Sequence, residues 1–115
     1  MSPAIDRAHL YRYTAGDVAL EREILSLFEQ QSQKWAARFN PDGSVDDWKE
    51  AAHSLKGAAR GIGAWALAEL CEAAEALATD CASADRRNIM RELNDVLNAV
   101  VAQAREWRLS LTPES

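Results

Sequence analysis

A histidine, a lysine and a glycine lie within about one helical turn of each other in the stretch AAHSLKGAARGIG, residues 51–63. His53 can act as a covalent nucleophile through a neutral ring nitrogen, and Lys56 can stabilise the negative charge of a phosphoryl group. Gly57 interrupts what otherwise reads as a helix, at a cost of roughly 1 kcal/mol relative to alanine. A missing side chain there would let a bulky phosphoryl donor reach His53. The three residues together predict phosphoryl transfer through this histidine.

Helical periodicity predicts that His53 faces away from the core. At about 100° per residue, one arc of the helix is apolar and contains Val45, Trp48, Ala52, Leu55, Ala59 and Ile62. The opposite arc contains Asp46, Lys49, His53, Lys56, Gly57 and Arg60. Lys49, Lys56 and Arg60 would then form a local cationic patch around the histidine. On periodicity alone, an ordinary surface histidine beside a tolerated glycine is an equal alternative, because surface faces are normally charged.

The rest of the sequence also reads as helices, without strand-like alternation. The expected helices cover residues 6–13, residues 17–39, Ser44 to the glycines at 61–63, a segment carrying Leu67 to Cys81, and a segment after Ser83. The last four are long and amphipathic. In residues 17–39 the expected apolar stripe contains Leu20, Ile24, Leu27, Phe28 and Trp35. The fourth helix carries on one side Leu67, Leu70, Cys71, Ala74, Leu77, Ala78 and Cys81. Short loops favour antiparallel neighbours. The sequence therefore predicts an all-α fold, an up-down-up-down four-helix bundle with a short additional N-terminal helix.

Length and charge narrow the classes of function. A chain of 115 residues favours one domain, here expected over residues 1–115. The net charge of −5 makes it a poor nucleic-acid binder, because phosphate contacts need clustered lysine and arginine. No apolar run approaches the roughly 20 residues that cross a membrane, and the first residues do not resemble a secretion signal. We therefore expect no nucleic-acid or membrane partner and a cytoplasmic location.

The two cysteines and two histidines do not predict a metal site. Cys71 and Cys81 fall on the apolar side of one expected helix, roughly 15 Å apart, so they cannot form a disulfide within it. Both are interpreted as small buried hydrophobes. His9 has no companion residues, and its expected role is that of a surface or capping residue. A zinc site from these four residues would lack any short ligand pair, and His53 faces away from the cysteines.

Three of the four tryptophans sit on apolar stripes and are expected in the core: Trp35, Trp48 and Trp107. Trp65 follows the glycines at 61–63, and inward packing is favoured over partial exposure near a partner surface. Ala64 and Ala68 are the better candidates for a small docking surface near the histidine.

The segment HSLKGAARGIGAWALAELCEAAE, residues 53–75, resembles the signature of histidine-containing phosphotransfer (HPt) domains. The matching positions are His53, Leu55, Lys56, Gly57, Gly63, Leu67 and Leu70. The segment YTAGDVALEREILSLF, residues 13–28, is similar to the N-terminal part of the same family. The resemblance covers most of the chain and implies a helical bundle that carries the histidine on an exposed helix face.

This resemblance implies a phosphorelay intermediate. His53 would accept a phosphoryl group from a phospho-aspartate and pass it to another receiver aspartate, with Nε2 as the nucleophile. The partners would be response-regulator receiver domains, one from a hybrid histidine kinase and one from a downstream regulator. Glu75 matches a position where family members often carry glutamine or glutamate near the other ring nitrogen. Ala58 and Ala59 stand where many relatives carry a hydroxyl residue.

The sequence predicts no kinase activity of its own. No glycine-rich ATP-binding loop is present, no cofactor is expected, and any Mg²⁺ needed for transfer would belong to the receiver. A monomer is expected. The alternative from another class is a non-catalytic helical adaptor, in which His53 is never phosphorylated. The joint presence of His53, Lys56 and Gly57 argues against it, because an adaptor does not need a nucleophile beside a cation and a gap.

Overall fold

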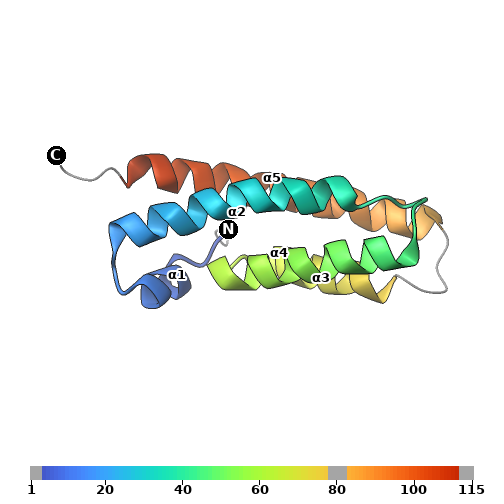
Figure 1. Cartoon of the computed structure of the whole chain (residues 1–115), viewed down its shortest axis with the longest axis horizontal. Coiled ribbons are helices and arrows are strands. Elements are labelled where there is room, and N and C mark those ends of the chain that lie inside the picture. The colour runs from blue at the N-terminus through green and yellow to red at the C-terminus, as the bar shows by residue number, and fades with distance from the viewer. Residues whose placement is uncertain (1–3, 78–82, 112–115) are drawn as a thin grey trace.

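Residues 4–77 and 83–111 are described by the computed structural model, and they form helices without any strand. The helices are α1 (Arg7–Thr14), α2 (Val18–Arg38), α3 (Val45–Ile62), α4 (Trp65–Ala76) and α5 (Ser83–Ser110). Figure 1 shows α2 to α5 running alternately in opposite directions, with α2 and α5 above α3 and α4. The short α1 packs against α2 and α3. The predicted four-helix bundle with an additional N-terminal helix is confirmed.

Side-chain caps fix the beginnings of the first three helices. Asp6, Asp17 and Ser44 each accept a hydrogen bond from the backbone N–H three residues later. Such caps satisfy amides that have no partner within the helix. The expected boundaries of these helices therefore agree with the structure to within a residue or two. None of the described helices has the length and apolar character needed to cross a membrane.

The turn between α3 and α4 depends on Gly63. Its φ of +80° lies in the left-handed region, and its N–H bonds to carbonyls of the last turn of α3. The backbone N–H of Asp6 donates to the Gly63 carbonyl at 2.9 Å. A Cβ at Gly63 would approach the Asp6 backbone to 3.0 Å, whereas a Cβ at Gly61 would meet nothing within 4 Å. Only one of these two glycines is therefore required by the fold.

Trp48 lies at the centre of the core. Its side chain is almost fully buried, and its Nε1 donates to the Ala74 carbonyl of α4 at 2.6 Å. The Arg86 side chain of α5 lies over the same indole ring and donates to the Leu77 carbonyl at the end of α4. The prediction of Trp48 in the core is confirmed. Trp35 and Trp107 are half-buried against the core.

Three expectations for the start of α4 and its surroundings are wrong. Trp65 is 44% exposed, since its Nε1 reaches outward to Asp6 Oδ2 at 3.1 Å and its ring meets the edge of His9. His9, expected to lack companions, therefore has one. Ala64 and Ala68 are buried in the core, because the first turn of α4 packs against the bundle. They cannot form a docking surface.

Other differences concern the apolar stripes. Leu27 and Val45, both placed on core stripes by periodicity, are exposed. Cys71 is fully buried as expected, and desolvation raises the pKa of its thiol to about 12. It therefore stays protonated and behaves as a small hydrophobe. Ala78 and Cys81, expected on the apolar side of the fourth helix, lie outside the described residues.

The two glycines at the end of α3 should respond oppositely to alanine. We expect Gly63→Ala to lower the free energy of unfolding by about 1–3 kcal/mol, because alanine must adopt a left-handed backbone conformation and crowd Asp6. Gly61→Ala should raise it by about 0.5–1 kcal/mol through helix propensity. Urea denaturation followed by circular dichroism measures both. Stabilisation by both variants would contradict the role assigned to Gly63.

Candidate functional site

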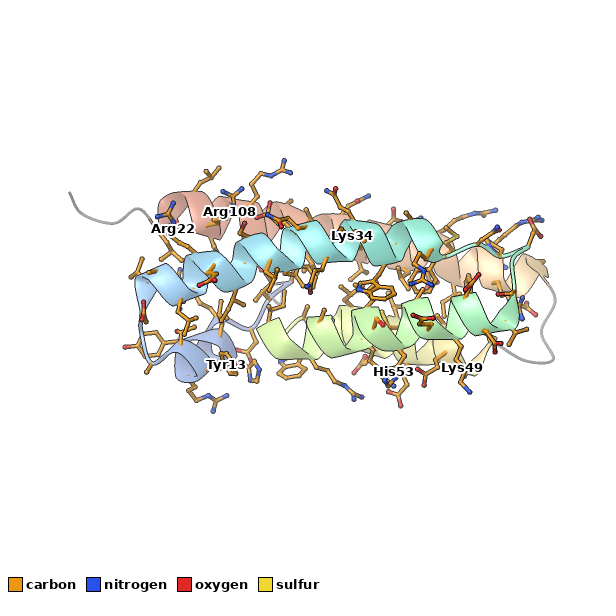
Figure 2. The ribbon with its side chains drawn as sticks, viewed as in Figure 1. Tyr13, Arg22, Lys34, Lys49, His53 and Arg108 are labelled. Atoms are coloured by element: carbon orange, nitrogen blue, oxygen red, sulfur yellow. The ribbon has the colours of Figure 1, made fainter. Side chains whose placement is uncertain are left out.

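His53 projects into solvent from the middle of α3. Its side chain is 73% exposed, while its neighbours Ala52 and Leu55 are fully buried. Figure 2 shows His53 and Lys49 projecting from the same side of α3, away from α2 and α5. The helix thus holds the imidazole on an outer face of the bundle, as its periodicity predicted. An exposed imidazole on a rigid helix is accessible to a large reaction partner.

Glu75 of α4 lies between His53 and Lys56. Its Oε2 is 3.3 Å from His53 Nδ1, and its Oε1 is 3.4 Å from Lys56 Nζ. The two carboxylate oxygens therefore face different partners on the neighbouring helix. Because Nδ1 faces the carboxylate, Nε2 lies on the far side of the ring, toward solvent. This arrangement favours the tautomer with the proton on Nδ1 and a free lone pair on Nε2.

The Oε2 atom of Glu75 is buried without a hydrogen bond. His53 Nδ1 is near enough to donate one, but the alignment of the two groups falls short of a hydrogen bond. An unsatisfied buried oxygen costs about 1–3 kcal/mol and calls for an explanation. Hydrogen bonds of reacting groups are often long or misaligned before the partner binds. The carboxylate is thus placed to accept from Nδ1 more strongly once the ring becomes positively charged.

The expected cationic patch is largely neutralised. The Lys56 side chain is only 14% exposed and is tied to Glu75, so it is not a free surface cation. Arg60 lies 3.8 Å from Glu72 of α4, with both groups exposed to solvent. Both cations point toward the α4 edge of the α3 face, where carboxylates meet them. Sequence periodicity placed them on the correct helix face but could not reveal these partners on α4.

Lys49 differs from the other two cations. It is exposed one turn before His53, in a hollow lined by Asp46, Lys49, Glu50, His53 and Glu75. No ion pair of Lys49 occurs within the part of the chain that the structure describes. Its ammonium group can therefore turn toward an anion at His53 without first breaking another contact.

Gly57 exposes bare backbone beside the histidine. A Cβ there would meet nothing within 4 Å, so internal packing does not demand glycine. Its φ is not in the left-handed region either. A side chain at this position would occupy space outside the bundle, next to His53. The site therefore combines an exposed imidazole, a carboxylate beside one ring nitrogen, an exposed lysine and an open approach.

Among residues 4–77 and 83–111, no three histidine, cysteine, aspartate or glutamate side chains gather as metal ligands. The acidic groups that share the hollow with His53 are accompanied by Lys49, and Glu75 is also paired with Lys56.

Comparisons with known proteins agree on one family. A family model described as the Hpt domain matches residues 19–107, more than half of the chain. The crystal structure of histidine phosphotransferase ShpA from Caulobacter crescentus is 39% identical, with a TM-score of 0.68 over 95% of this chain and 99% of that one. Histidine-containing phosphotransfer protein B (HptB) from Pseudomonas aeruginosa PAO1 shares the fold at 18% identity, with a TM-score of 0.82 over 96% of this chain and 98% of that chain. A search of curated proteins gives no match.

The contact between Glu75 and His53 should be visible in the tautomer of the ring. We expect Glu75→Ala to lower the fraction of neutral His53 that carries its proton on Nδ1, because the acceptor for that proton is removed. Long-range ¹H–¹⁵N NMR correlations of the imidazole at pH 8 measure this fraction.

Glu72→Ala is the matched control, since Glu72 is an exposed carboxylate on the same helix that contacts Arg60 instead. An equal change of tautomer in both variants would mean that the overall negative charge of α4, and not the Glu75 contact, determines the tautomer of His53.

Proposed function

Because the chain belongs to the Hpt domain family of phosphorelay proteins, we propose that His53 accepts a phosphoryl group from the aspartyl phosphate of one receiver domain and passes it to an aspartate of another. The observation that carries this proposal is the orientation of the ring. Nδ1 faces Glu75 at 3.3 Å, and the exposed side chain turns Nε2 to solvent. A receiver of a hybrid histidine kinase would be the donor, and a downstream regulator the acceptor.

His53 and the aspartyl phosphate together account for each bond and proton in the transfer step. The lone pair of Nε2 attacks phosphorus, a P–N bond forms, and the bond between phosphorus and the aspartate oxygen breaks. The aspartate leaves as a carboxylate. The proton on Nδ1 stays, so the phosphorylated ring is cationic and can donate to the buried Oε2 of Glu75. The second receiver reverses the step with its own aspartate as nucleophile.

The neighbouring cations would have different roles in this reaction. Lys56 is held against Glu75, so it would position the carboxylate and offset its negative charge near the incoming phosphoryl group. Lys49 is exposed and without an ion pair among the described residues, so it would contact the phosphoryl oxygens directly. Arg60 would add longer-range attraction, weakened by Glu72. Gly57 would leave room for the receiver loop that carries the aspartate.

Phosphorylation should depend on one of the two histidines. After treatment with phosphoramidate or with a phosphorylated receiver, we expect wild type and His9→Gln to gain one phosphate by intact mass, and His53→Gln to gain none. The label should be lost in acid and kept in base, as expected of phosphohistidine. Because His53 is exposed, the variant should keep its helical circular dichroism spectrum.

A phosphate retained on His53→Gln would contradict the assignment of the nucleophile. If no donor labels the folded wild-type chain, the adaptor interpretation replaces phosphotransfer.

Removing Lys49 or Lys56 should slow transfer from a receiver by distinguishable routes. Lys49→Ala should lower the rate by up to about fivefold, the scale of an exposed charge contact, with a smaller effect at high salt and no change in the His53 tautomer. Lys56→Ala should also slow transfer, but with a changed tautomer, because it releases Glu75. Stopped-flow or quench-flow transfer assays at two salt concentrations measure both rates.

Lys34→Ala is the control, an exposed lysine on α2 (Figure 2) that removes the same charge away from His53. A loss of rate equal to that of Lys49→Ala would indicate an effect of net charge alone.

A further inference from the structure

Glu75 lies in the last turn of α4, the part of a helix that opens most easily. α4 ends at Ala76, one residue after Glu75. The last carbonyls of a helix have no partner within it, so helix ends fray. The C-cap residue Leu77 has φ −85° and is not left-handed, and the last turn contains no basic side chain. The carboxylate that faces His53 therefore needs support from outside its own helix.

Trp48 of α3 and Arg86 of α5 supply this support. Nε1 of Trp48 donates to the Ala74 carbonyl at 2.6 Å, and Nε of Arg86 donates to the Leu77 carbonyl at 3.0 Å. These two carbonyls lie on either side of Glu75 in the chain. Side chains that bond the last carbonyls of a helix act as its cap. The backbone that carries Glu75 is thus held by one side chain from each of two neighbouring helices.

The two capping side chains also contact each other. The guanidinium carbon of Arg86 lies 5.8 Å from the centre of the Trp48 ring, within the range of a cation–π interaction. Arg86 Nη1 also lies 3.5 Å from the Pro41 carbonyl, in the connection between α2 and α3. Figure 1 shows this connection, the end of α4 and the start of α5 at the same end of the bundle. Both side chains are buried, so they form a packed support and not a surface contact.

The Glu75 carboxylate has weaker contacts than the backbone around it. Its Oε2 lies 3.3 Å from His53 Nδ1 without a hydrogen bond, and its Oε1 lies 3.4 Å from Lys56 Nζ. A shift of about 1 Å in the last turn of α4 would put either oxygen beyond hydrogen-bonding distance. The exposed imidazole cannot hold the glutamate in return. The position of the carboxylate therefore depends on the backbone that the two caps hold.

We propose that Arg86 and Trp48 are positioning residues for phosphoryl transfer, because they cap the last turn of α4 and so keep the Glu75 carboxylate beside Nδ1 of His53. The inference rests on the proposed function and adds to it two buried residues outside the hollow around the histidine. Both act through Glu75, which favours the tautomer that leaves Nε2 free to attack. Without either cap, the last turn opens and more of the neutral imidazole carries its proton on Nε2.

Two variants remove the caps one at a time. Trp48→Phe removes the Nε1 donor while keeping an aromatic ring, and Arg86→Met removes the guanidinium while keeping a long unbranched side chain. We expect both to lower the fraction of neutral His53 with its proton on Nδ1 at pH 8 toward the fraction in Glu75→Ala. Long-range ¹H–¹⁵N NMR correlations measure it. For transfer from a receiver, kcat should fall about tenfold, the low end of the effect of a lost orienting partner, with KM within about twofold.

Local opening of α4 has its own readout. In both variants, amide hydrogen exchange at Ala76 and Leu77 should become faster than in wild type, while exchange in the middle of α4 keeps its rate. Arg86→Lys keeps a charged donor near the Leu77 carbonyl, so it should recover part of the tautomer fraction and of kcat. Should Arg86→Met not give a helical circular dichroism spectrum, Trp48→Phe carries the same measurements.

Trp35→Phe and Arg87→Met are the matched controls. Trp35 is a half-buried indole on α2 beneath the Arg38 guanidinium. Arg87 is the neighbour of Arg86 in the chain, but it pairs with Asp42 at 2.7 Å. Each control loses the same kind of group from a contact other than the end of α4. Both should keep the wild-type tautomer and kcat, even where urea denaturation shows a lower free energy of unfolding.

A double variant separates positioning from a general loss of stability. In the Glu75→Ala background Arg86 has no carboxylate to place. Adding Arg86→Met there should therefore change the tautomer fraction and kcat by less than about twofold. A purely structural role of Arg86 instead gives the same further loss of kcat with and without Glu75.

The outcomes that contradict the inference are distinct. A wild-type tautomer in folded Trp48→Phe and Arg86→Met overturns it and leaves phosphotransfer intact. An equal loss of kcat from Arg86→Met in both backgrounds also overturns it. If no receiver labels the folded wild-type chain, the proposed function fails and the role in transfer fails with it. The tautomer measurement then still shows whether the caps place Glu75, so the two failures are distinguishable.

Discussion

The buried hydrogen bond from Trp48 Nε1 to the Ala74 carbonyl sets the register of α3 against α4. Its net contribution is about 1 kcal/mol, but breaking it would leave an indole N–H buried without a partner, at a cost of about 1–3 kcal/mol. Ala74 precedes Glu75 in the chain, and Trp48 lies five residues before His53. The same contact that orders the core therefore determines which α4 side chain faces the histidine.

This register matters because the site is made by two helices and not one. α3 alone supplies His53, Lys56 and the open backbone at Gly57, but no group that orients the imidazole. Glu75 completes it by presenting one oxygen to Nδ1 and the other to Lys56. Sliding α4 by one turn along α3, about 5.4 Å, would remove both contacts. The packing of small buried residues between the helices, Ala52, Ala59, Cys71 and Ala74 among them, is what lets the helices approach closely enough.

The helices and the histidine face could be predicted from the sequence because their causes are local. Caps such as Ser44 and the 3.6-residue period act within a few residues, and they placed α3 and His53 correctly. Trp65 was misplaced because its environment is not local. A hydrogen bond to Asp6, far away in the chain, draws it outward. The environment of Lys56 is not local either, since its largely buried position depends on Glu75 of another helix.

The exposed position of Leu27 on α2 shows a second limit of prediction from the sequence. Periodicity put Leu27 on the core stripe because leucine at helical spacing is usually buried. In the structure it is exposed and borders an apolar groove between α2 and α3 instead. An amphipathic pattern does not distinguish apolar residues that pack inside from those at the margin of the stripe. The groove is thus visible only once α2 and α3 are placed side by side.

The exposed face of α3 has a charged edge toward α4 and an apolar edge toward α2. The groups that would orient and charge the ring come from α3 and α4, whereas the groove is built by α1, α2 and the last turns of α3. Surface substitutions on α2 are therefore expected to leave Glu75 in place relative to His53.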